Sequence, residues 1–189
     1  MKKRVTLSIT LVILISLFTL GQEEFTWNQN GISPEYVVID LDSIDQKNLY
    51  NNTINWIKET YKNPDEVIKM TIQNEKVRFE GFQDNLICTN SLGLTNCYYA
   101  LYTIEIGFKN NKYKFTPIKL EYKVPSSQYS AGGLISILND GSNYFNKKGI
   151  IRKMYSTIPS SIESLFNELN SNLANYLTAE TENNESDDW

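Results

Sequence analysis

Apolar and polar side chains alternate along most of the stretch from Pro64 to Lys123, and this period of two constrains the fold more than any other feature of the chain. Its clearest part is a set of six apolar side chains that share one parity: Tyr98, Ala100, Tyr102, Ile104, Ile106 and Phe108. Successive side chains of a β-strand point to opposite faces, so such a run makes one face apolar. The pattern predicts an antiparallel sheet with one packed face and one face in water.

Two turns divide this stretch into strands. A turn at 74–75 separates the alternating runs 68–72 and 77–80, and an Asn-Asn pair at 110–111 follows the longest run. In the next strand the apolar parity changes at Pro117, which predicts a bulge. Because proline has no N–H for a ladder, we expect this strand to lie at an edge or to be interrupted there.

The polar parity of these strands defines a candidate binding face. Its members are Arg78, Glu80, Tyr99, Glu105, Lys119 and Glu121. We expect their charges to pair across neighbouring strands. The alternative is that Glu80, Glu105 and Glu121 act as acid and base, as paired carboxylates do in glycosidases.

Two amphipathic helices are expected to cover the apolar face. The first follows a short strand at 36–41, begins at a capping box at 43–46 and ends before Pro64. The second begins at a capping box at 160–163 and keeps apolar residues at helical spacing to Leu177. These elements predict an α+β fold with its helices on one face of the sheet.

One part of the chain resembles a known family. The stretch 54–68, INWIKETYKNPDEVI, and the hairpin through 77–81 are similar to a bacterial secreted domain of unknown function with a TBP-like fold. The resemblance covers 36–123, and Trp56 and the Tyr-x-Asn-Pro helix stop carry it. It implies a curved antiparallel sheet of about five strands, in the order β-α-β-β-β-β-α, with helices packed on one face. It implies no catalytic residue.

The N-terminus predicts export. Three basic residues at 2–4 precede a run at 5–20 in which 11 of 16 residues are apolar, and small residues precede a cut after Gly21. This is typical of a cleaved signal peptide, with an uncleaved membrane anchor as the alternative. The first cysteine is Cys88, so we do not expect a lipoprotein. We expect a periplasmic or extracellular protein with no stable membrane span after cleavage.

The expected organisation has four parts. A signal peptide at 1–21 and a lead-in arm at 22–35 precede a single domain at 36–177. An acidic tail at 178–189 follows, and it is expected to be disordered because it carries five acidic residues and no basic one.

Cys88 and Cys97 bracket a polar stretch that contains Gly93. Outside the cytoplasm such a pair is a candidate disulfide, and a reduced, buried pair is the alternative. The spacing is not that of a CxxC motif, which argues against a redox-active role.

Composition limits the function. The chain has no histidine, which removes the commonest general base and metal ligand, and we expect no cofactor. Its net charge of −4 argues against nucleic acid as a partner. The leading hypothesis is a non-catalytic cell-envelope module that binds a protein or other ligand. A carboxylate-based hydrolase and a purely structural envelope component are the alternatives.

Overall fold

The computed structural model describes residues 23–126, 128 and 131–186, so the expected signal peptide lies outside the described residues. Strands and helices follow one another in the order β1 (Thr26–Asn28), β2 (Gly31–Ser33), β3 (Val37–Asp40), α1 (Gln46–Thr60), α2 (Pro64–Val67), β4 (Ile68–Ile72), β5 (Lys76–Ser91), β6 (Leu94–Lys109), β7 (Lys112–Val124), β8 (Gly133–Ser136) and α3 (Ile158–Ser186). Short 3₁₀ turns at 142–144 and 153–155 lie between β8 and α3. Among these described elements, no helix is long and apolar enough to span a membrane.

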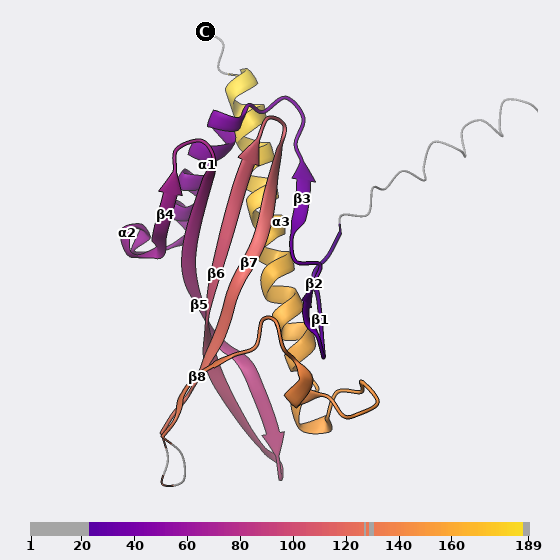
Figure 1. The fold of residues 1–189 in the computed structure, drawn as a ribbon. Helices are drawn as coiled ribbons and strands as arrows, with labels where there is room; N and C mark the ends of the chain where they lie inside the picture. The colour runs from indigo at the N-terminus through magenta and orange to yellow at the C-terminus, as the bar shows by residue number, and fades with distance from the viewer. Residues whose placement is uncertain (1–22, 127, 129–130, 187–189) are drawn as a thin grey trace, which may run out of the picture.

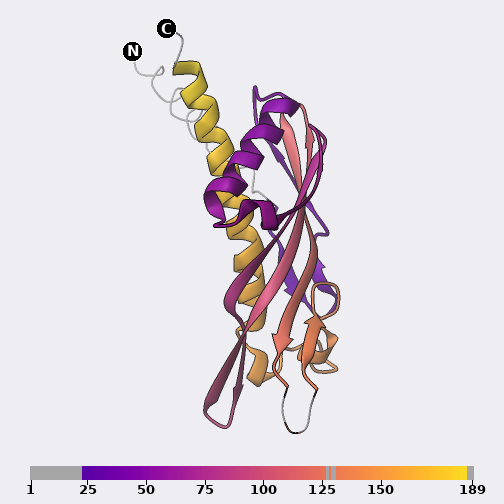
Figure 2. The ribbon, with the colours of Figure 1, turned by 90° about the vertical axis from the view of Figure 1, so that its left-hand side faces the viewer.

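The main sheet is antiparallel and has six strands, in the order β3-β7-β6-β5-β4, with β8 also paired to β7 (Figure 1). It therefore has more strands than the resemblance implied. Figure 2 shows α1 and α3 on one side of the sheet, with the opposite side open. The α+β prediction, with helices on a single face, is confirmed.

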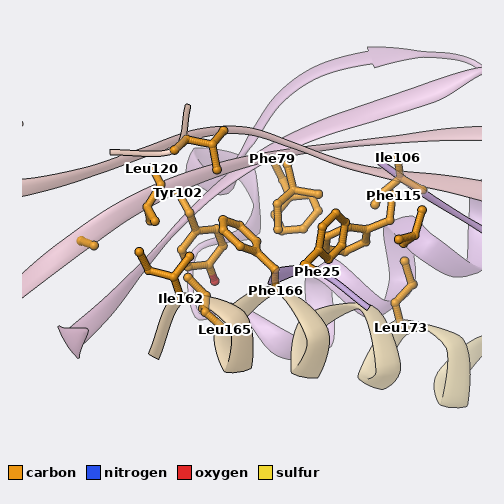
Figure 3. Packing of buried hydrophobic residues seen from close by; sticks show 14 of the residues in the cluster. Phe25, Phe79, Tyr102, Ile106, Phe115, Leu120, Ile162, Leu165, Phe166 and Leu173 are labelled. Atoms are coloured by element: carbon orange, nitrogen blue, oxygen red, sulfur yellow. The ribbon is translucent and has the colours of Figure 1, made fainter. Parts of the chain in front are cut away.

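The core lies between the sheet and the two long helices (Figure 3). Phe79 and Ile106 from the strands and Ile57 from α1 are fully buried, as is Phe166 from α3. Each lies at the parity or helical spacing that the sequence pattern assigned to the covered face. Side chains brought from both ends of the sequence thus share one apolar layer.

The stretch 22–35 was predicted as a lead-in arm, and this prediction was wrong for its described part. Residues 26–33 form the β1-β2 hairpin, and Phe25 and Trp27 are 1% and 2% exposed. The Phe25 ring lies between two others, with its centroid 5.8 Å from that of Phe115 and 6.1 Å from that of Phe166. Phe25 and Trp27 point to the core on either side of one polar residue. This alternation covers only three residues within a polar stretch, too few to be recognised as a strand.

Polar contacts also tie this hairpin to the rest of the molecule. The Trp27 indole N–H donates to the carbonyl of Ile137 at 2.9 Å, and its backbone N–H donates to Glu163 at 2.8 Å. Asn167 accepts from the N–H of Phe25 at 2.8 Å and donates to its carbonyl at 3.0 Å. The hairpin is thus fixed both to α3 and to the segment after β8.

Both predicted capping boxes were misplaced. The N-cap of α1 is Asp45, whose carboxylate accepts from the N–H of Asn48 at 2.8 Å, while Ser43 lies at φ 64° in the preceding loop. The helix α3 begins at Ile158, so Ser160 lies inside its first turn. Several residues with capping side chains compete at each start, and tertiary contacts select one.

The predicted irregularity in β7 is confirmed. Ile104 faces Pro117 while its neighbour Thr103 faces Lys119, so Ile118 is an extra residue on β7. On the other side of β7, β3 pairs with 112–115 and β8 with 121–124. Pro117 lies in the gap between these two partners, where its missing N–H leaves no ladder bond unmade.

The cysteines lie on paired strands rather than at the ends of an open loop. Cys88 faces Cys97 near the tip of the β5-β6 hairpin, and the structure joins them in a disulfide. Pairing continues to Ser91 and Leu94, and both turn residues between them have positive φ, Leu92 at 50° and Gly93 at 81°.

The helix α3 continues to Ser186, which contradicts the predicted disorder of 178–186. This stretch has no glycine or proline to end a helix, and extending an existing helix costs far less than starting one. Residues 187–189 of the expected tail lie outside the described residues.

Candidate functional site

The open face of the sheet brings most of the predicted face residues together in two groups of ion pairs. Arg78 Nη2 lies 2.7 Å from Glu105 Oε2, and Lys76 Nζ lies 3.5 Å from the other oxygen of that carboxylate. Lys119 Nζ bridges Glu80 at 3.3 Å and Glu121 at 3.6 Å. The predicted cross-strand pairing therefore holds for Arg78 with Glu105 on neighbouring strands and for Glu80 with Lys119 across β6. Glu121 pairs with Lys119 of its own strand, β7.

The ion pairs govern the chemistry of Glu105. Partial burial by itself would raise the pKa of this carboxyl, but the hydrogen bond from Arg78 and the charges of Lys76 and Arg78 lower it overall. A general acid needs the opposite shift. Glu80 and Glu121 also have cationic partners, so the three carboxylates are arranged as ion pairs and not as a converging acid and base.

The sixth predicted residue, Tyr99, belongs to neither group of ion pairs. It is 37% exposed and lines a shallow hollow of about 290 Å³ with Cys97, Lys123 and Pro125. Register places further large, exposed apolar side chains on the same open face: Val38, Phe82 and Leu134. Exposed Tyr36 joins them beside Lys114. The face therefore combines paired charges with separate apolar patches.

A groove lies at the end of this face where β6 turns into β7, at the top of Figure 1. We call it the lysine groove and define it by Tyr36, Val38, Lys76, Gly107, Lys109, Lys112 and Lys114. Its volume is about 690 Å³. Gly107 forms the floor of the groove, where it faces Lys76 on one side and Lys114 on the other. Because glycine has no side chain, the groove is deeper at this point.

The lysines of this groove differ from the cations farther down the face. Among the residues that the structure describes, Lys109 and Lys112 have no carboxylate within ion-pair distance. These two lysines face each other across β6 and β7. Lys114 Nζ lies 5.0 Å from the centroid of the Tyr36 ring. Like charges directly opposite each other are unfavourable. Asp40 faces Lys112 from β3 but forms no ion pair with it in the described chain, so the positive charge at this end is not neutralised by ion pairs.

Sequence reasoning missed the lysine groove. Two signals were present, a Lys-x-Lys pair at 112–114 directly after the Asn-Asn turn and a glycine inside a strand at 107. Neither indicates a site by itself, because the cross-strand register that brings Gly107 between two lysines cannot be read from one strand.

A second hollow of about 480 Å³ lies on the covered side, between α3 and the irregular part of β5. It is lined mainly by polar side chains, with Tyr102 among them. The Tyr102 hydroxyl lies 2.8 Å from that of Tyr61, and burial raises the pKa of both groups. Neither phenol is thus prepared to ionise.

Metal ligands are not gathered in the part of the chain that the structure describes. No group of three or more histidine, cysteine, aspartate or glutamate side chains stands close enough there to hold a metal ion.

Comparison with known proteins identifies the family of the central domain. The family model described as "Domain of unknown function (DUF4468) with TBP-like fold" matches residues 36–123. No curated protein matches the chain.

Two solved structures have the same fold. A DUF4468 family protein from Bacteroides ovatus superposes with a TM-score of 0.58 at 10% identity, covering 75% of this chain and 84% of that chain. A TBP-like protein from Parabacteroides distasonis gives a TM-score of 0.52 at 9% identity, with 75% and 90% covered. At such identities the likeness concerns the fold alone. Residues 36–123 of this chain are a DUF4468 domain, a domain of unknown function with a TBP-like fold.

Proposed function

We propose that this protein is an exported, non-catalytic binding module of the bacterial cell envelope, and that the open face of its sheet contacts a partner protein. The observation that carries the proposal is the combination of ordered ion pairs and exposed apolar side chains on that face. Tyr36, Val38, Phe82, Tyr99 and Leu134 are each 37% to 63% exposed.

Such a surface suits recognition better than folding. Exposed ion pairs contribute only about 0–1 kcal/mol each to stability, so the charged rows add little to the fold. Apolar patches bordered by polar groups are typical of interaction sites. The fixed geometry of Arg78 and Lys119 would present charge to a partner with little further ordering.

The catalytic alternative has weaker support. Hydrolysis by two carboxylates requires one of them to hold a proton near neutral pH. The cations beside Glu105 lower its pKa, and Glu80 and Glu121 share Lys119. Binding without chemistry therefore fits these side chains better.

The export part of the proposal rests on the basic and apolar pattern of residues 1–21. Intact mass and N-terminal sequencing of the protein from its native cells test it, and a chain that begins at Gln22 is the expected result. A chain that retains its first residues in the cytoplasm would contradict export.

The binding part is tested by photo-cross-linking in native cells. A photoreactive phenylalanine analogue replaces Phe82 on the open face, and a matched variant carries it at Asn175, an exposed position on α3. We expect one defined cross-linked species from position 82 and none of that mass from position 175. Equal yields from both positions, or a species from position 175 alone, would reject the open face as the contact surface.

A further inference from the structure

We propose that the lysine groove binds an acidic, extended segment of a partner protein. The inference rests on the proposed function and adds the chemistry of the ligand. Its basis is a contrast between two sets of cations on one face. The first set has carboxylate partners within 4 Å: Lys69, Lys76, Arg78 and Lys119. The described residues supply no such partner to the second set, which is Lys109, Lys112 and Lys114.

Charge complementarity selects an anionic occupant. The groove is lined by four lysines and by two carboxylates, those of Glu75 and Glu105, and Glu105 is already engaged by Lys76 and Arg78. Asp40 faces Lys112 in the register but forms no ion pair in the described chain. This end of the face therefore carries excess positive charge in a protein whose net charge is −4.

Shape allows the anionic groups to approach. A Cβ built on Gly107 would meet only Lys114 Cε, at 4.0 Å, so the space above the floor is open. An acidic side chain entering there would lie between the strands that carry Lys76 and Lys114. Hydrogen bonds from ammonium groups to carboxylates are the strong kind in such a site.

One observation favours a peptide over another polyanion. Tyr36 and Val38 border the groove, each nearly half exposed, and offer apolar contact to aliphatic side chains. A nucleic acid or a glycan has no aliphatic side chains to place there.

The direct test measures fluorescence anisotropy of the purified protein with a labelled peptide in which glutamate alternates with valine. A peptide with glutamine in place of glutamate is the first control. We expect binding of the glutamate peptide that weakens as salt rises, and no comparable binding of the glutamine peptide. Equal binding of both peptides would overturn the proposal, as would binding of neither.

Three variants locate the site. Lys112→Gln combined with Lys114→Gln should weaken binding about tenfold, because two exposed ion pairs are lost. Gly107→Val keeps every charge but fills the floor, and it should also weaken binding about tenfold. Lys147→Gln combined with Lys148→Gln makes the same charge change at exposed positions after the first 3₁₀ turn and should leave affinity unchanged.

The outcomes separate this inference from the proposed function. Unchanged binding by Gly107→Val, or equal loss in the Lys147 and Lys148 variant, would show that the groove is not the site. Tighter binding of polyglucuronate or duplex DNA than of the peptide would overturn the choice of ligand. A cross-link from position 82 together with failure of the peptide would reject the ligand class while keeping the open face.

Discussion

At the residue scale, a few side chains do more than their sequence context indicates. Phe25 follows two glutamates and precedes a polar stretch, yet its ring joins the strand residue Phe115 to the helix residue Phe166. Alternation of apolar and polar residues does not reveal this position, because β1 has only three residues and only Trp27 among them is buried. A short amphipathic pattern carries too little information to be separated from a loop.

Truncation of this ring should therefore be costly. Phe25→Ala removes a fully buried aromatic, and we expect a loss of about 3–5 kcal/mol in the free energy of unfolding. Urea denaturation at neutral pH measures it. The neighbouring Glu24 is exposed, so Glu24→Ala serves as the control and should change stability by less than about 0.5 kcal/mol. A small effect at Phe25 would mean that the hairpin is not part of the core.

Two glycines in strands provide a matched pair of substitutions that should change stability in opposite directions. A Cβ at Gly81 would collide with the ring of Tyr102, whereas a Cβ at Gly107 would make only an ordinary van der Waals contact with Lys114 Cε. Gly81→Ala should destabilise by about 1–3 kcal/mol through overpacking. Gly107→Ala should stabilise by about 0.4–1 kcal/mol, because alanine restricts the unfolded chain. Thermal unfolding of both variants would contradict this if their midpoints shifted in the same direction.

The ion pairs of Glu105 predict a dependence of stability on pH. Its pKa is lowered below the ordinary value of 4.5, so its contribution is complete above that pH and is lost as pH falls through the folded-state pKa. Glu105→Gln should thus lower stability at pH 7 and have a smaller effect at pH 3. Urea unfolding at both pH values measures the difference, and Glu66→Gln is a control at an exposed site. An equal loss at pH 3 would show that charge plays no part.

At the element scale, strands and turns were predicted better than the ends and caps of the helices. The hairpin of β4 and β5, the turn at 110–111 and the interruption at Pro117 all follow from local parity and turn residues. Local patterns did not predict where α1 and α3 begin or where α3 ends. A helix cap depends on which neighbouring side chain the tertiary structure leaves free to bind the helix end. The segment 125–157 had no clear period, and it contains β8 and two 3₁₀ turns.

The β5-β6 hairpin gives a prediction at this scale. Its tip is held by Cys88 and Cys97, and its residues are largely exposed. Replacing both cysteines with alanine should release the tip and speed amide hydrogen exchange at 89–96, while exchange in β7 stays slow. The global free energy of unfolding should fall by no more than about 2–4 kcal/mol. Uniform acceleration across the sheet would show instead that the tip and the core unfold together.

At the scale of the whole molecule, one property of the sequence decided the architecture. A sheet that is apolar on one face needs cover there, and the two helical stripes that contain Ile57 and Phe166 supply it. The lysine groove could not be predicted in the same way, since Gly107, Lys76 and Lys114 come from three strands and meet only through register. Local patterns predict layers, whereas sites between strands require the assembled sheet.

The contact of Phe25 with Phe166 has a consequence for biosynthesis. Segments near both ends of the described chain close the same apolar layer, so a nascent chain cannot complete its core until the C-terminal helix has left the ribosome. Until then the N-terminal aromatics have no partner from that helix. The export proposed above would require an unfolded chain, and delayed closure of the core would favour that state.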